Sequence, residues 1–320
     1  MWRSRYFALR FVHDLAEAIV GVSPAITALR AYLPKVARSS ATVLITGATG
    51  SGKERIAEAI HALGPRADGP FVAVNCAALP DTLIESELFG HERGAFTGAI
   101  AASTGHLARA DHGTLFLDEI GEMSAHAQAK LLRVLETRKV QPVGGSRSIA
   151  VDIRVIAATN LPLEALVTSG GFRVDLYYRL NVARLELPPL KDRREDIPLL
   201  LRHAIGERNA REQCAVGAPD PELLHCLMAH DWPGNVRELN NLVEAIFIDP
   251  PQGQIGLRHL PSVFRAMFVR YQTSVASERD RLICALEQTH WNKAKAAKQL
   301  QWSRMTLYRK LTKYRIDRSA

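Results

Sequence analysis

A glycine-rich segment that follows a short apolar run constrains this chain most. Residues 43–46 read VLIT, which is typical of a buried strand, and GATGSGK at 47–53 opens a helical pattern. Glycines allow tight turns, so backbone N–H groups and the start of the following helix can face an anion. Gly47, Gly52 and Lys53 have the spacing of a phosphate-binding loop, in which the lysine reaches the terminal phosphates.

The same order of strand, loop and helix recurs up to Pro189. Apolar runs at 71–75, 114–119 and 154–160 alternate with helical stretches such as 125–135. Strands that are apolar throughout, placed between helices, predict an α/β fold with a parallel sheet covered on both faces. Beyond Pro189 no strands are expected; the helices expected there are 196–211, 220–230, 236–248, 278–289, 293–300 and 304–314.

Polar side chains stand where these strands end. Asp118 and Glu119 close one strand, Asn75 another, and Thr159 and Asn160 a third. Such residues often serve only as turn formers, but the carboxyl ends of parallel strands meet at one edge of a sheet, where ligands bind. An aspartate there can hold Mg²⁺, directly or through water, and a glutamate can polarise an attacking water. We therefore expect Asp118 to hold Mg²⁺ beside the phosphates.

The positive charge is concentrated near the C-terminal end. The net charge is +8, and residues 277–320 carry eleven basic against four acidic residues, which leaves +1 for the rest. Clustered Lys and Arg neutralise phosphates and release counterions, so we expect this segment to bind nucleic acid, although a merely soluble basic helix has the same charge. No apolar run approaches the roughly 18 residues of a membrane span, and the four cysteines form no CxxC pair. A cytoplasmic protein without membrane contact is expected.

Two capping residues predict a helix-turn-helix in the basic segment. Asn292 can cap a helix at 293–300, and Ser303 can cap a second helix that begins at Arg304. Leucines at helical spacing, together with Trp302, supply its core. The residues expected to face DNA are Lys293, Lys295, Ser303, Arg304, Met305, Thr306, Tyr308, Arg309 and Lys310.

Eight ordered blocks resemble the central domain of the NtrC-like bacterial enhancer-binding proteins, which are AAA+ ATPases that activate sigma-54 RNA polymerase. The blocks are GATGSGKE (47–54), SELFGHERGAFTGA (86–99), GTLFLDEIG (113–121), AKLLRVLE (129–136), VGGS (143–146), ATN (158–160), FRVDLYYRLNV (172–182) and WPGNVREL (232–239). The likeness runs from about Ile19 to Phe247, and the C-terminal segment resembles the Fis-type helix-turn-helix of this family. Ala48 departs from it, since Glu is common there.

The resemblance implies ATP and Mg²⁺ as cofactors. Lys53 would be the Walker A lysine, Asp118 and Glu119 the Walker B pair, and Asn75 the residue that restrains Glu119. Thr159 and Asn160 would form sensor I. The segment assigned to nucleotide comprises Gly47, Ala48, Thr49, Gly50, Ser51, Gly52, Lys53 and Glu54.

Arg237 would be sensor II. Asn235 and Glu238 have the spacing of a helix N-cap and its N3 partner, which places Arg237 in the first helical turn. A surface arginine that stabilises the lid is the alternative.

Arg173 and Arg179 lie six residues apart in FRVDLYYRLNV. By resemblance they are arginine fingers that complete the site of a neighbouring subunit, which requires a head-to-tail interface and implies a ring. A hexamer is expected, with a dimer in the resting state. The alternative, which applies to Arg179 first and to Arg173 second, is an ion pair with Asp175 within the chain.

The GAFTGA segment, which comprises Gly94, Ala95, Phe96, Thr97, Gly98 and Ala99, suits neither a core nor a helix. We expect a mobile tip, and an aromatic residue there suggests a partner that buries it. By resemblance this partner is sigma-54, with Thr97 as the most sensitive position. A second loop at 143–146 is expected beside it, although a tight turn without function also fits.

The sequence thus predicts a sigma-54-dependent transcriptional activator that binds enhancer DNA and uses ATP hydrolysis to convert the closed polymerase complex into an open one. An AAA+ machine with another protein substrate, and a DNA-binding repressor that uses nucleotide only as a ligand, are the alternatives. GAFTGA argues against the first, and Glu119 with Arg173 against the second. No receiver domain is expected. The predicted parts are 1–18 (N-terminal segment), 19–189 (ATPase), 190–249 (helical lid), 250–277 (linker) and 278–320 (helix-turn-helix).

Overall fold

The structure is a computed structural model of the 320-residue chain. It describes residues 15–78, 80–96, 99–266, 268, 282–283, 285–286, 289, 291–300, 302–314 and 316. The chain forms two compact units. The first contains residues up to 206 together with 232–241, and the second contains 207–231 together with 242–320.

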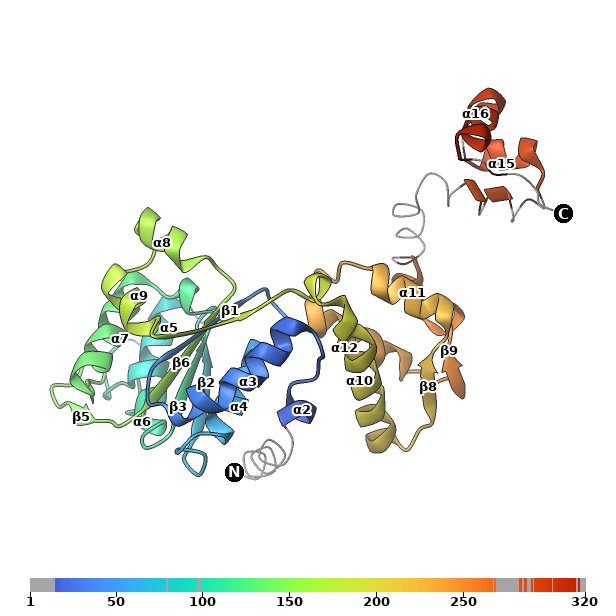
Figure 1. The fold of residues 1–320 in the computed structure, drawn as a ribbon. Coiled ribbons are helices and arrows are strands. Elements are labelled where there is room, and N and C mark those ends of the chain that lie inside the picture. The colour runs from blue at the N-terminus through green and yellow to red at the C-terminus, as the bar shows by residue number, and fades with distance from the viewer. Residues whose placement is uncertain are drawn as a thin grey trace. The chain divides into compact units, whose positions relative to one another are not determined.

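A five-stranded sheet forms the centre of the first unit (Figure 1). Its strands are β1 (Val43–Gly47), β2 (Phe71–Asn75), β3 (Thr114–Asp118), β6 (Arg154–Thr159) and β7 (Ala183–Leu187). They lie in the order β2-β3-β6-β1-β7, and every neighbouring pair is parallel. The predicted α/β class with a parallel sheet is confirmed.

Helices cover both faces of this sheet. They are α2 (Leu15–Ala18), α3 (Pro24–Arg38), α4 (Lys53–Ala62), α5 (Asp81–Phe89), α6 (His106–Arg109), α7 (Ala125–Thr137), α8 (Leu163–Ser169) and α9 (Val174–Leu180). Successive strand residues point to opposite faces. On β3, Leu115 and Leu117 therefore join the core under α5, α7 and α9, whereas Phe116 joins the core under α3 and α4.

Short elements extend from the sheet at two places. A hairpin of β4 (Lys139–Val140) and β5 (Ile149–Ala150) follows α7, and the 3-10 turn η1 (Ile120–Glu122) follows β3. After β7, the 3-10 turns η2 (Leu190–Asp192) and η3 (Arg194–Asp196) lead into α10 (Ile197–Glu212).

The second unit contains strands that the sequence did not predict. Between α10 and α11 (Pro221–Ala229) lies β8 (Val216–Pro219), which pairs in parallel with β9 (Gly253–Ile255). The expectation that strands stop at Pro189 is therefore wrong. Both strands are very short and hold Gly or Pro, so no periodicity marks them. The expected linker, in addition, holds β9, η4 (Leu257–His259) and helical residues 262–266.

Two helices of the predicted helix-turn-helix are described, α15 (Lys293–Gln299) and α16 (Arg304–Tyr314). The side chain of Asn292 accepts the Lys295 N–H at 3.1 Å, and Ser303 Oγ accepts the Thr306 N–H at 3.1 Å, so both predicted caps are present. Leu307 and Leu311 are buried, and Trp302 packs against them. Most of the helix expected at 278–289 lies outside the described residues.

The helix α11 is followed by α12 (Asn235–Ile246), whose beginning belongs to the first unit and whose end belongs to the second. Among the helices that the structure describes, none is long and apolar enough to cross a bilayer.

Candidate nucleotide-binding site

The loop between β1 and α4 is shaped by two glycines with positive φ. Gly50 has φ +75° and Gly52 has φ +107°, a backbone region that favours glycine. A Cβ on Gly50 would lie 2.3 Å from the Gly234 carbonyl oxygen, whereas a Cβ on Gly52 would meet nothing within 4 Å. The start of α4 therefore faces open space, with backbone N–H groups that can hold an anion.

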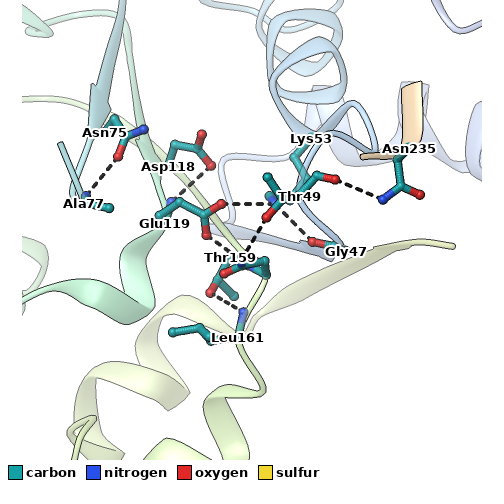
Figure 2. Close-up of polar contacts among 11 residues, drawn as sticks. Gly47, Thr49, Lys53, Asn75, Ala77, Asp118, Glu119, Thr159, Leu161 and Asn235 are labelled. Atoms are coloured by element: carbon teal, nitrogen blue, oxygen red, sulfur yellow. Dashed lines mark hydrogen bonds and ion pairs between the residues drawn. The ribbon is translucent and has the colours of Figure 1, made fainter. Parts of the chain in front are cut away.

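Lys53 is held at this loop although its side chain is charged and buried. Its Nζ donates to the Gly47 carbonyl at 3.0 Å and lies 3.5 Å from Glu119 Oε1 (Figure 2). A buried ammonium needs such partners, because it has lost its water shell. Phosphate oxygens could replace both of these contacts.

The two acids at the end of β3 lie together beside Lys53 (Figure 2). Asp118 Oδ1 accepts the Glu119 N–H at 3.0 Å, and Glu119 has a left-handed backbone with φ 52°. Burial raises the pKa of Asp118, the charge of Glu119 raises it further, and Lys53 opposes both. Two neighbouring carboxylates with one ammonium keep a negative charge and hard oxygen ligands, so this donor set fits Mg²⁺.

The structure brings only some of the strand-end residues to the loop. Asn160 donates from Nδ2 to Thr49 Oγ1 at 3.0 Å, and its N–H donates to Glu119 Oε2 at 3.1 Å. Asn75 is opposite Asp118 in the sheet, but its Oδ1 accepts the Ala77 N–H at 2.9 Å, which is a local turn.

Thr159 is fully buried, and its Oγ1 accepts the Leu161 N–H at 3.0 Å. In this structure its hydroxyl shapes the turn beside the loop. Glu119 is thus held by Lys53 and by the backbone of Asn160, and the proposed restraint by Asn75 stays a prediction.

The expected capping pair at the start of α12 is wrong. Asn235 has φ 52° and is buried; its Nδ2 donates to the Thr49 carbonyl at 2.9 Å, and its Oδ1 accepts the Leu190 N–H at 2.7 Å. Glu238 instead accepts the Gly234 N–H at 2.8 Å. The Asn235 amide is therefore used to fix the phosphate-binding loop, because that loop and η2 each offer it one backbone partner.

Arg237 lies in the first turn of α12, as the sequence predicts. Its N–H donates to the Gly50 carbonyl at 3.2 Å, and its side chain is exposed. The arginine is thus anchored to the loop through its backbone, and its guanidinium is free of the protein core.

Two buried charges around η3 were missed by the sequence reasoning: Arg193 supports the phosphate-binding loop, and Asp196 holds the start of α3. Arg193 donates from Nη2 to the Ser51 carbonyl at 2.9 Å, and burial lowers its pKa while Asp196 partly offsets this. Asp196 accepts the N–H groups of Val22 and Ser23 at 2.6 and 2.8 Å and the Ser23 hydroxyl at 2.7 Å. Arg193 and Asp196 both lie in the charged run KDRRED (191–196), a pattern that is typical of a solvent-exposed helix start.

Arg173 and Arg179 are both exposed. Arg173 forms a bidentate ion pair with Asp175, with 3.1 Å from Nε to Oδ1 and 2.7 Å from Nη2 to Oδ2. Arg179 donates from Nη2 to the Leu135 carbonyl at 3.2 Å. The intrachain partner of Asp175 is therefore Arg173 rather than Arg179, because α9 begins between them and turns the Arg173 side chain over its first residues.

The GAFTGA loop is described at 94–96 and 99, whereas Thr97 and Gly98 lie outside the described residues. Phe96 is 40% exposed, and its ring stands edge-on to His91 with 5.0 Å between the ring centres. Gly94 N–H donates to the Ala99 carbonyl at 2.9 Å and closes the base of the loop.

The second loop lies beside it. The Glu92 N–H donates to the Val143 carbonyl at 3.0 Å, and a Cβ on Gly144 would lie 2.8 Å from Ala95 Cβ.

The basic face of the helix-turn-helix carries the residues expected to meet DNA. Met305 is 79% and Tyr308 52% exposed, and the ammonium of Lys293 lies 5.2 Å from the centre of the Tyr308 ring. Of the remaining residues, Lys295, Ser303, Arg304 and Arg309 are exposed, whereas Thr306 and Lys310 are half-buried. The roles assigned to all these site residues stay predictions.

A parallel sheet with a phosphate-binding loop after β1, an acid pair after β3 and an asparagine after β6 defines a P-loop NTPase of the AAA+ class. The family described as Sigma-54 interaction domain matches residues 19–186, the AAA+ ATPase lid domain matches 191–277, and the Fis family of bacterial regulatory proteins matches 275–314. The chain belongs to the sigma-54 activator family. The resemblance seen in the sequence is confirmed, while the predicted domain boundaries stay predictions.

Named relatives agree with this assignment. The chain is 44% identical to the Nif-specific regulatory protein of Herbaspirillum seropedicae, over 94% of this chain and 62% of that protein. It is 47% identical to the transcriptional regulatory protein ZraR of Escherichia coli K12, over 92% of this chain and 68% of that protein. The structure of NtrX from Brucella abortus in complex with ATP superposes with a TM-score of 0.72 and 32% identity, over 96% of this chain and 72% of that one.

Proposed function

We propose that the chain is a sigma-54-dependent transcriptional activator that is tethered to enhancer DNA and uses ATP hydrolysis to open the polymerase complex. The observation that carries the proposal is one unit that holds both a nucleotide site, with Glu119 beside Lys53, and a GAFTGA loop with an exposed Phe96. Such a unit can turn over nucleotide at one end of its sheet and contact a partner through a separate loop.

The nucleotide chemistry follows from the contacts of Lys53. The β- and γ-phosphates of ATP would take Lys53 away from Gly47 and Glu119, which frees the glutamate to orient a water. Asp118 would hold Mg²⁺, which when bound neutralises charge on the phosphate oxygens. Asn160 bridges the loop and Glu119, so it is placed to report which nucleotide is bound.

A second subunit would complete the site. Arg173 is exposed, and its described ion-pair partner Asp175 is exposed as well. An exposed ion pair is worth little, so the guanidinium can leave Asp175 for a phosphate at small cost. We infer that Arg173, with Arg179, acts on the nucleotide of a neighbouring copy in a ring, which is expected to be a hexamer that assembles from dimers.

The output would pass through the paired loops. The Phe96 ring contacts the His91 ring, and the loop at 143–146 packs against Ala95. A shift of either loop would therefore displace the other. Sigma-54 is the partner that family membership favours for this surface. The helix-turn-helix would hold the ring near the promoter by binding enhancer DNA.

The test is ATP-dependent open-complex formation by sigma-54 holoenzyme, measured with wild type, Glu119→Gln, Phe96→Ala and Thr97→Ala. Glu119→Gln should bind ATP and fail to hydrolyse it. The two loop variants should hydrolyse ATP within a few-fold of wild type and still fail to open the promoter, because the described part of the GAFTGA loop contacts His91 and the loop at 143–146. Normal open-complex formation by both loop variants would reject this partner and favour an AAA+ machine with another protein substrate.

A further inference from the structure

Gln128 on α7 is a wholly buried amide whose described hydrogen bonds all join it to backbone groups. Its Nε2 donates to the Met123 carbonyl at 2.8 Å and to the Gly171 carbonyl at 3.1 Å, and its Oε1 accepts the Arg173 N–H at 2.8 Å. The amide thus uses both donor hydrogens and its oxygen. Because a buried backbone group without a partner is costly, these three bonds fix the places of the groups they join.

The three backbone groups belong to two functional segments. Met123 closes the 3-10 turn η1, which begins directly after Glu119 at the nucleotide site. Gly171 and Arg173 flank Phe172 just before α9, on the segment that carries the proposed finger arginine. The helices α7 and α9 pack against each other in the core under the sheet (Figure 1). Gln128 therefore connects the end of η1 with the segment that precedes α9.

The Arg173 side chain itself is exposed, and its described contacts are with Asp175, two residues further on. Among the described residues, the structure gives the Arg173 guanidinium no further hydrogen-bond partner. Its position in space is therefore set by its backbone, and the side chain of Gln128 is the group that holds the Arg173 N–H.

We propose that Gln128 is a positioning residue for Arg173, and that it sets where this arginine meets the nucleotide of the neighbouring copy. The inference rests on the proposed action of Arg173 across the subunit boundary. A misplacement of about 1 Å at a reacting group can lower a rate by about 10²-fold, so loss of these three bonds should reduce hydrolysis without removing any group from the nucleotide site of its own subunit.

Mixed rings separate this role from a general loss of packing. Gln128→Leu and Gln128→Met, the second of which keeps the length of the side chain, should each bind ATP and hydrolyse it at least 10-fold more slowly than wild type. Mixing either variant with Lys53→Ala subunits should restore hydrolysis, because the intact Arg173 of the Lys53→Ala subunit then faces the nucleotide site of a Gln128 variant, which retains Lys53, Asp118 and Glu119. Mixing either with Arg173→Ala subunits should restore nothing, because every subunit then offers a faulty arginine.

Two controls fix the interpretation. Arg173→Ala mixed with Lys53→Ala shows the rescue expected for a trans arginine, and Leu131→Ala, a buried residue on the same helix, shows a packing defect. The packing variant should be rescued by both partners, since its folded copies keep a working arginine and a working site.

Rescue of the Gln128 variants by both partners, or by neither while the Arg173→Ala and Lys53→Ala pair is rescued, would overturn the proposal, as would near-normal hydrolysis by both homogeneous variants. Failure of the control pair in rings shown to be mixed would instead refute the trans role of Arg173, and the inference about Gln128 would fall with it.

Discussion

At the scale of single residues, the nucleotide site holds the Asp118 carboxylate in an environment that disfavours its charge. Burial raises the pKa of Asp118, and the neighbouring Glu119 adds to this. Because the folded pKa lies above its usual value, the folded protein keeps the proton at pH values where the unfolded chain has released it. The free energy of unfolding therefore falls as pH rises through that window, and the penalty is fully present at neutral pH.

Asp118→Asn should relieve this penalty while removing the proposed Mg²⁺ ligand. The asparagine keeps Oδ1 for the Glu119 N–H, so the nucleotide-free variant should melt above wild type at pH 7, by on the order of a few degrees, and hydrolyse no ATP. The gain should shrink as pH is lowered towards 4. Melting curves at several pH values check this, and a lower melting temperature at pH 7 would show that Asp118 stabilises the empty site.

His61 provides a second titration inside the first unit. Its Nδ1 lies 2.9 Å from Thr114 Oγ1, and burial, with a smaller contribution from Arg154, lowers its pKa to about 4. The unfolded chain takes up the proton below about pH 6.5, so stability is lost as pH falls from there towards 4.

Between pH 7.5 and 5, wild type should lose about 2 kcal/mol of unfolding free energy more than His61→Gln does. The glutamine can still meet the Thr114 hydroxyl and does not titrate. Urea unfolding of both proteins at the two pH values gives the difference directly. Equal losses in the two proteins would mean that His61 is not the group that takes up the proton.

At the scale of elements, the phosphate-binding loop depends on two glycines for different reasons. Both have positive φ, which costs a residue with a Cβ about 1–2 kcal/mol. Only at Gly50 would the new Cβ also collide with protein, namely with the Gly234 carbonyl at 2.3 Å. That collision would push the start of α12 away and break the bond from the Arg237 N–H.

Gly50→Ala should therefore destabilise the chain by clearly more than Gly52→Ala does. Gly52→Ala should keep its fold and lose ATP affinity, because its Cβ enters the open space where the phosphates are proposed to lie. Urea unfolding and nucleotide binding of this matched pair test both statements. Comparable stability in the two variants would show that the contact between the loop and α12 contributes little.

The elements that the sequence predicted are those with a strong local pattern. The strands of the sheet centre are apolar on both faces, and Gly52, Asn292 and Ser303 mark helix starts, so their bounds agree with the structure within a residue or two. The sequence did not predict the edge strand β7, because it lacks the continuous apolar run of the central strands: Arg184 and Glu186 face outward and alternate with buried leucines.

Hydrogen bonds between residues far apart in the sequence could not be predicted, because a sequence pattern reports only local structure. The sequence predicts a cap at Asn235, since capping is the local use of an asparagine, whereas its real partners lie 186 and 45 residues away. Gln128 and Arg193 likewise act on backbone groups that only the fold brings near. The site chemistry was predictable from strand ends, but the bonds that hold it in place were not.

At the scale of the whole molecule, the charge is divided as unevenly as the functions are. Residues 277–320 carry +7 of the net +8, and the ATPase part is nearly neutral. If DNA is held only by the basic end, then the salt dependence of DNA binding must come from that end, because it reports how many phosphates are neutralised.

Removing two charges from either part should therefore have unequal effects. Lys293→Gln with Lys295→Gln should make the negative slope of log affinity against log salt shallower by about 2 for duplex DNA, since each phosphate contact contributes about −0.9. Lys35→Gln with Arg38→Gln, two exposed charges at the end of α3, should leave the slope unchanged. Both double variants should keep wild-type ATPase. A slope that becomes equally shallow in the two would mean that DNA responds to the net charge of the molecule, and the assignment of DNA binding to the helix-turn-helix surface would fail.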